Sequence, residues 1–225
     1  MTRRKVLTLP TTLAALLLLT GFQAVKKPAP LRPADPLLDA FRKIPTASLS
    51  DAVDQVANKR GFLSHDMRPV FEARFAGRAV TALLRPLEQA GGPASGALGV
   101  LHSVQAIDES GPGQVLVVVI ESGPNISGLD IAGIGGLMAT DAKVRGLEGA
   151  IIDGGARDLV EITRLAFPVF SRSVIPSSSV GRYTSVFKNQ KVLCAGVEIS
   201  PGDIVVADRD GVVAIPQGQA EAVLK

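Results

Sequence analysis

The chain has 225 residues, 46% hydrophobic and 20% charged, which is typical of one packed globular domain with a short additional segment. The isoelectric point of about 9.2 would suit a nucleic-acid-binding protein, but three of the 24 basic side chains lie in residues 1–24, where there is no acid. The remaining residues hold 21 basic and 21 acidic side chains, so the body is neutral and nucleic acid is excluded as a partner.

Residues 1–24 are predicted to be an export signal, because Arg3, Arg4 and Lys5 precede an apolar stretch over 13–19. The two arginines resemble a twin-arginine signal, and an ordinary secretory signal is the alternative. Either one predicts an exported, periplasmic protein. The apolar stretch is short for a membrane span, so we expect membrane contact only through an uncleaved leader, if at all.

Residues 25–36 are rich in Pro and Lys and are predicted to be a linker, so the folded domain is expected to span 37–225. Apolar residues recur at helical spacing from Asp35 until Pro45. A second helix is expected over 51–59, after a cap at Ser48 or Ser50, and Gly61 is expected to end it. A strand over 78–84 and a helix over 94–109 are expected to follow.

The middle of the chain alternates between strands and helices, which predicts an α/β layer. The continuous apolar run over 115–120 is typical of a strand buried on both faces. After it we expect a helix over 137–145 that stops at Gly146, a strand over 150–152, a helix over 159–165 and a strand from Val169.

The last third of the chain is predicted to be rich in strands. We expect strands over 192–199, 204–207 and 212–215, separated by turns, and a final helix over 217–224. The fold class is therefore α/β, a single compact domain with a β-rich C-terminal part. The lone cysteine, Cys194, excludes an intrachain disulfide and is expected to be a buried structural thiol.

Two segments of the predicted α/β layer suggest a functional site. Glycines 133, 135 and 136 come just before a predicted helix, whose free N–H groups can bind a carboxylate or a phosphate. Arg157 and Asp158 follow the predicted strand over 150–152, at the edge where α/β proteins place their sites. Arg157 offers a planar pair of donors to an anion, and Asp158 offers the hard oxygen ligand that Mg²⁺ or Mn²⁺ prefers.

Several other interpretations fit the same residues. The glycines can form a simple tight turn, Asp158 can be an acid stabilised at a helix N-terminus, and Arg157 with Asp158 can be a solvated charge pair. A dinucleotide site is a further alternative, because Asp153 lies twenty residues after Gly133. That fingerprint is incomplete, since Met138 occupies the place of its third glycine.

These residues resemble the family of metal-dependent 4-hydroxy-4-methyl-2-oxoglutarate aldolases, which also includes regulators of ribonuclease E activity. The family signature is a glycine, twenty residues, Arg-Asp, and an acid three residues further on. Gly136, Arg157, Asp158 and Glu161 match it. The resemblance covers about residues 44–216 and extends to the segments 48–52, 136–143, 145–149, 152–158 and 201–208.

The resemblance implies an α/β/α-type domain that assembles as a homotrimer or homohexamer, with a site at the subunit interface. It implies that Arg157 binds the substrate and stabilises an enolate oxygen, and that Asp158 holds a divalent cation, Mg²⁺ or Mn²⁺, together with waters. It also implies that the substrate carboxylate is held by backbone N–H groups of Gly135, Gly136, Leu137 and Met138.

The implied activity is a lyase reaction, in which 4-hydroxy-4-methyl-2-oxoglutarate-type oxo acids undergo retro-aldol cleavage to pyruvate. Oxaloacetate decarboxylation shares the same enolate and is expected as a side activity. The alternatives are a non-catalytic regulatory or binding protein, or an enzyme of the same fold that acts on another hydroxy or oxo acid. The sequence departs from many family members, which carry an acid in place of Gly136, and Glu121 and Asp130 are candidates to replace that acid.

Overall fold

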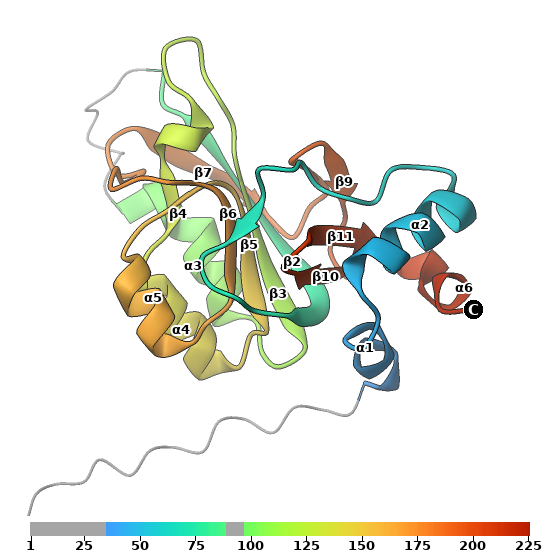
Figure 1. Ribbon diagram of the computed structural model, residues 1–225. Helices are drawn as coiled ribbons and strands as arrows, with labels where there is room; N and C mark the ends of the chain where they lie inside the picture. Colours follow the sequence, from blue (N-terminus) through green and yellow to red (C-terminus); the bar gives the residue numbers. More distant parts are fainter. Residues whose placement is uncertain (1–34, 89–96) are drawn as a thin grey trace, which may run out of the picture.

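The computed structural model describes residues 35–88 and 97–225, which form the predicted α/β fold (Figure 1). Its main sheet follows the strand order β1-β6-β5-β3-β2-β10-β11, while β4 pairs with β5 and β7 pairs with β2. A separate hairpin is formed by β8 and β9.

The strands of the described residues are β1 (Arg68–Pro69), β2 (Phe75–Pro86), β3 (Gln114–Ile120), β4 (Ala132–Ile134), β5 (Gly149–Ala156), β6 (Val169–Val174), β7 (Tyr183–Lys188), β8 (Val192–Cys194), β9 (Val197–Ile199), β10 (Ile204–Asp208) and β11 (Gly211–Ile215). The α-helices are α1 (Pro36–Phe41), α2 (Thr46–Ala57), α3 (Leu101–Asp108), α4 (Gly136–Arg145), α5 (Leu159–Leu165) and α6 (Ala220–Val223). Short 3₁₀ helices are η2 (Ala97–Val100), η3 (Gly128–Asp130) and η4 (Gln217–Gln219).

The centre of the sheet consists of β2, β3, β5 and β6, which are parallel to one another. The apolar run of β3 is buried on both faces, as its sequence predicts. Helices α3, α4 and α5 pack on one face through buried residues such as Ile107, Ala139 and Ile162. The other face packs against β8, β9 and β10 through residues that include Phe75 and Phe170, whose rings meet edge to face at 5.6 Å. The connections from β4 to α4 and from β5 to α5 are short, and β4 and β5 are parallel. Both helices therefore start at the same edge of the sheet.

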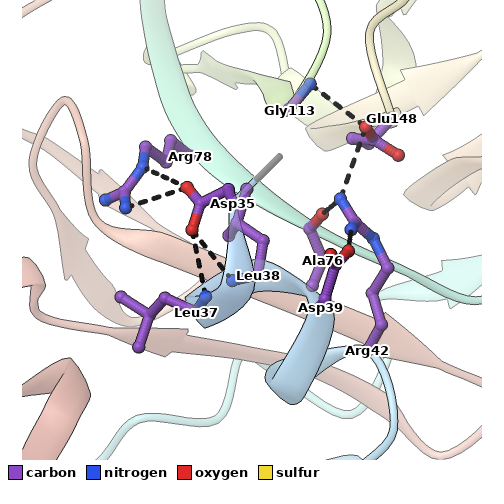
Figure 2. A network of polar contacts seen from close by, with 9 residues as sticks. All are labelled: Asp35, Leu37, Leu38, Asp39, Arg42, Ala76, Arg78, Gly113 and Glu148. Atoms are coloured by element: carbon purple, nitrogen blue, oxygen red, sulfur yellow. Dashed lines mark hydrogen bonds and ion pairs between the residues drawn. The ribbon is translucent and has the colours of Figure 1, made fainter. Parts of the chain in front are cut away.

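Helices α1, α2 and α6 form a second cluster over β10 and β11, at the other end of the molecule (Figure 1). A polar network fixes α1 there (Figure 2). The Asp35 carboxylate accepts hydrogen bonds from the N–H groups of Leu37 and Leu38 and from the guanidinium of Arg78 on β2. Arg42 lies 3.4 Å from Glu148 and donates to the carbonyl of Ala76. Asp35 and Pro36, which we assigned to the linker, are thus the cap and first residue of α1.

Helix α2 begins at Thr46, five residues before the predicted start, and the expected caps Ser48 and Ser50 lie inside the helix. The cap comes instead from Asp208 on β10. Its carboxylate accepts hydrogen bonds from the Thr46 N–H at 2.9 Å and the Thr46 hydroxyl at 2.6 Å. Asn58, in a left-handed conformation, ends the helix before the expected Gly61. The cap prediction was wrong because the capping side chain is remote in sequence.

We expect Asp208→Ala to lower the free energy of unfolding by about 1 to 2 kcal/mol, because the first turn of α2 loses its cap. Urea denaturation at pH 7 measures this, with the exposed α2 residue Asp54→Ala as the control that removes a carboxylate from the same helix. Burial by itself would raise the pKa of Asp208, but the hydrogen bonds from Thr46 and Asp210 outweigh it and lower the pKa. The stabilisation is therefore present above the unfolded-state pKa and lost as the pH falls through the lowered one. Equal losses for both variants would contradict this role.

Three further differences from the predicted elements concern one predicted strand, one predicted helix and the strands that were not predicted. The segment predicted as one strand over 192–199 is a hairpin, because Ala195 and Gly196 both adopt positive φ angles of 46° and 89° and reverse the chain. The helix expected over 94–109 is η2 followed by α3, and residues 94–96 lie outside the described part. Strands β1, β4 and β7 were not predicted from the sequence.

The predicted export signal over 1–24 and most of the linker lie outside the described residues. Within 35–88 and 97–225, no helix combines the length and apolar character that a membrane crossing requires.

Candidate active site

Two loops meet where the parallel neighbours β4 and β5 end. Register places Ile134 opposite Ala156, so Gly135 and Arg157 follow at the same edge of the sheet. The Arg157 N–H donates to the Ile134 carbonyl at 3.1 Å, which ties the two loops together. Helix α4 starts directly after one loop and α5 after the other. The structure thus brings together the glycine segment and the Arg-Asp pair, as the sequence predicts.

Asp158 precedes α5 in a left-handed conformation, with φ of 58°, and its side chain makes no capping hydrogen bond to that helix. The carboxylate turns instead toward α4, where Oδ2 accepts a hydrogen bond from the Gly136 N–H at 3.0 Å. Asp158 is therefore not simply an acid at the start of its own helix. A non-glycine residue held at positive φ costs about 1 kcal/mol or more, and such residues gather at functional sites.

Gly136 leaves space for a second carboxylate. A Cβ atom at this position would lie 2.1 Å from Oε2 of Glu161 and 2.5 Å from its Cδ. The Glu161 side chain thus occupies the volume that a side chain at position 136 would need. The Asp158 and Glu161 carboxylates consequently approach the same residue, one at its N–H and one at its Cα.

Glu161 of α5 thus brings a carboxylate next to Gly136, where the sequence lacks the family's acid. Of the two expected candidates, Glu121 pairs with Arg85, with Oε2 2.6 Å from Nε. Asp130 belongs to η3, and no hydrogen bond or ion pair of the described residues connects its side chain with Arg157 or Asp158. The sequence did not indicate the approach of Glu161 to Gly136, because it depends on how α5 packs beside α4.

The Arg157 guanidinium is half-exposed and has Nε 3.8 Å from Oδ2 of Asp158. That separation is an ion pair without a hydrogen bond. Within the part of the chain that the structure describes, no hydrogen bond engages the Arg157 side chain, so its donors can bind an anion. Arg157 and Asp158 thus form the charge pair of the alternative interpretation. This pair occupies none of the guanidinium N–H donors with a hydrogen bond.

The first turn of α4 supplies the expected backbone donors only in part. The first helical bond of α4 runs from the Ala139 N–H to the Gly135 carbonyl, so the preceding N–H groups have no partner within the helix. Asp158 takes the N–H of Gly136. Among the described residues, the N–H groups of Leu137 and Met138 have no hydrogen-bond partner and can serve as donors, whereas that of Gly136 is engaged by Asp158.

A cavity of about 320 Å³ opens beside these groups. Its polar side consists of Arg157, Asp158 and the start of α4. The remainder is lined by Ala132, Gly133 and Ile134 of β4, Val100 and Val104 near α3, and Ser178, Ser179 and Val180 after β6. The sequence did not identify the lining from α3 or from the segment after β6, because neither carries a local motif. A second cavity, of about 260 Å³, lies near α2 and β11, away from the Arg-Asp pair.

The dinucleotide alternative is not supported. Asp153, which would have to bind a ribose hydroxyl, is buried, pairs with Arg172 at 2.9 Å and accepts a hydrogen bond from the Ala195 N–H. Gly133 lies in β4, where a Cβ atom would meet Ile120 and Ile152 at about 3 Å. The neighbouring Cys194 is buried, as expected, and burial raises the pKa of its thiol.

The donor set agrees with a divalent cation of the Mg²⁺ or Mn²⁺ type. Such ions are bound through one or two carboxylates and keep several waters. Asp158 and Glu161 offer two carboxylates beside Gly136. The described residues contain no group of three His, Cys, Asp or Glu side chains arranged to hold a metal ion.

The amino-acid sequence matches a family model and several known proteins. The family model described as "RraA-like: Aldolase/RraA" matches residues 46–214. A Halalkalibacterium halodurans protein named "Putative 4-hydroxy-4-methyl-2-oxoglutarate aldolase" is 33% identical over 188 residues, which cover 82% of this chain and 79% of that protein.

Solved structures share the fold. An uncharacterized protein from Pseudomonas syringae pv. tomato superimposes with a TM-score of 0.71 at 29% identity, over 86% of this chain and 82% of that one. Streptomyces coelicolor RraAS2, described as an unusual member of the RNase ES inhibitor RraA protein family, gives a TM-score of 0.70 at 23% identity, over 86% and 91% of the two chains. The likeness to RraAS2 concerns the fold alone. With a family model that matches most of its length, the chain belongs to the RraA-like family of aldolases and RraA proteins.

Proposed function

We propose that this protein is a divalent-metal-dependent carbon–carbon lyase that releases pyruvate from 4-hydroxy-2-oxo acids, the class that contains 4-hydroxy-4-methyl-2-oxoglutarate. The observation that carries the proposal is the convergence of Arg157, Asp158 and the first turn of α4 on one cavity, with the Glu161 carboxylate close by at Gly136. The aldolase name of the Halalkalibacterium halodurans relative supports the same reaction class.

Each group of the site would interact with a different charged or polar part of the substrate or with the cation. The N–H groups of Leu137 and Met138 hold the substrate carboxylate at the positive end of α4. Arg157 donates to the 2-oxo oxygen, where negative charge develops. A divalent cation held by Asp158 and Glu161 would supply further positive charge at that place.

In the reaction, the C4 hydroxyl loses its proton and becomes the carbonyl of the leaving fragment. The C3–C4 bond breaks, and its electron pair forms the enolate of pyruvate, which Arg157 stabilises. Protonation at C3 then gives pyruvate. Loss of CO₂ from oxaloacetate produces the same enolate, so we propose decarboxylation as a side activity.

Assembly and export belong to this proposal. Leu137, Val160 and Val174 are 87%, 70% and 63% exposed, and all three lie at the edge of the sheet that carries the site. Exposed apolar side chains at this edge favour contact with a second copy of the chain, and we propose a homotrimer or homohexamer, which the molar mass in solution tests. The predicted leader supports a periplasmic location.

The test is pyruvate release from a panel of 4-hydroxy-2-oxo acids, including 4-hydroxy-4-methyl-2-oxoglutarate, and from oxaloacetate. We expect release in Mg²⁺ or Mn²⁺, none in chelator, and none from Asp158→Ala, which should also bind Mn²⁺ more weakly. Asp141→Ala, which removes an acid from the far half of α4, is the control. Unchanged Mn²⁺ affinity in Asp158→Ala would refute the metal site. A folded protein that binds neither Mn²⁺ nor any oxo acid would indicate the non-catalytic alternative.

A further inference from the structure

The cavity beside Arg157 has a buried serine in its wall. Ser179 lines this cavity, although only 2% of its surface is exposed. Its backbone is fixed, because its carbonyl accepts hydrogen bonds from the N–H groups of Arg182 at 3.1 Å and Tyr183 at 2.9 Å. Among the residues that the structure describes, no hydrogen bond engages the Ser179 hydroxyl. A buried hydroxyl without a partner is unfavourable, so this one has a donor and an acceptor to offer to a ligand.

The fold places Ser179 beside β4, and it places the Arg157 side chain over the residue that follows β4. Ser178 pairs with Ala132 of β4 in a parallel bridge, so Ser179 lies alongside the next residue of that strand. A Cβ atom at Gly135, directly after β4, would lie 3.1 Å from Nε of Arg157. With strands about 4.8 Å apart and a rise of about 3.3 Å per residue, Ser179 and the guanidinium are about 8 Å apart.

From this placement we propose that Ser179 binds the C4 hydroxyl of the substrate, and that it thereby selects 4-hydroxy-2-oxo acids over analogues without this hydroxyl. The proposal rests on the proposed function for the placement of the 2-oxo oxygen at Arg157. Two hydrogen bonds of about 2.9 Å fill most of the separation of about 8 Å. The remaining gap suits two oxygens on carbons that are two bonds apart, as C2 and C4 are. A serine hydroxyl both donates and accepts, and so does the hydroxyl of the substrate.

The test compares a ligand that has the C4 hydroxyl with ligands that lack it, in the presence of Mn²⁺. In Ser179→Ala, kcat/KM for pyruvate release from 4-hydroxy-2-oxopentanoate should fall by about 3- to 10-fold, because one hydrogen bond between neutral groups is lost. The inhibition constant of 2-oxopentanoate should not change, because this acid has no hydroxyl for Ser179 to bind. Exchange of the methyl hydrogens of pyruvate in D₂O should also keep the parental rate, because pyruvate has no C4.

Ser103→Ala is the matched control. Ser103 of α3 is fully buried, its hydroxyl has no hydrogen-bond partner among the described residues, and it does not line the cavity. This variant loses the same kind of buried hydroxyl, so all three measurements should equal those of the parent. Ser179→Cys, which keeps a side chain of similar shape with a weaker donor, should give a kcat/KM between those of the parent and Ser179→Ala.

The possible failures are distinguishable. If Ser179→Ala keeps the parental kcat/KM for 4-hydroxy-2-oxopentanoate, Ser179 does not bind the hydroxyl, and the proposed function stands. If Ser179→Ala impairs all three measurements together, Ser179 only maintains the shape of the site, and its role in selection is wrong. If the parent exchanges the hydrogens of pyruvate but does not cleave 4-hydroxy-2-oxopentanoate, the preference for the hydroxyl is wrong while an enolate-forming site remains. If the folded, Mn²⁺-loaded parent does neither, the proposed function fails first.

Discussion

Arg157→Ala should lower kcat for pyruvate release by about 10²- to 10³-fold, the usual loss when one donor to a developing oxyanion is removed. The reason lies in the geometry, since Nε is 3.8 Å from Asp158 and no hydrogen bond within the described residues engages the guanidinium. Its donors are thus available to the substrate. Arg157→Lys should retain part of the activity, because it keeps the charge but loses the planar fork.

The control for this experiment is Arg164→Ala, which removes an exposed arginine from the last turn of α5. Its kcat and KM should match those of the parent. If Arg157→Ala raised KM alone and left kcat unchanged, Arg157 would bind substrate and transition state equally, and its role at the enolate oxygen would be wrong.

Gly136→Ala is expected to weaken Mn²⁺ binding by about 10- to 100-fold, the range seen when the groups around a metal site are disturbed. The new Cβ atom would lie 2.1 Å from Oε2 of Glu161, so that carboxylate must leave its place. Because the displaced atoms are at the end of a flexible, exposed side chain, thermal stability should change little. Mn²⁺ titration and thermal unfolding of the same samples measure the two effects.

Gly218→Ala is the matched control, because a Cβ atom there meets nothing within 4 Å. The double variant Gly136→Asp with Glu161→Ala moves the carboxylate from α5 to α4 and should recover part of the Mn²⁺ affinity. A Gly136→Ala protein with parental Mn²⁺ affinity would show that the position of Glu161 is irrelevant to the site.

Elements with local signals could be predicted from the sequence. Helix α5 occupies the predicted 159–165, and α4 ends at Gly146, whose φ of 86° suits a glycine after a helix. The start of α2 was predicted wrongly because its cap, Asp208, lies 162 residues away from Thr46. The hairpin of β8 and β9 was missed because Ala195 adopts a positive φ that its residue type does not favour.

The candidate site likewise has a part that local sequence signals predict and a part that they do not. The location of Arg157 and Asp158 at the edge of the sheet could be predicted, because both residues follow a buried strand. The contact between Glu161 and Gly136 could not, since it arises from the packing of α4 beside α5. Equally, Val104 and Val180 reach the cavity from α3 and from the segment after β6, which the sheet brings together over long sequence separations.

The most direct test of an enolate-forming site is hydrogen exchange at the methyl group of pyruvate, followed by proton NMR in D₂O. This measurement needs only the groups that bind the 2-oxo acid and the cation, and it does not depend on the rest of the substrate. We expect the protein with Mg²⁺ or Mn²⁺ to remove the methyl signal, and we expect chelator, Arg157→Ala and Asp158→Ala each to prevent this. A protein that binds pyruvate and Mn²⁺ yet leaves the methyl signal intact would contradict an enolate-forming site.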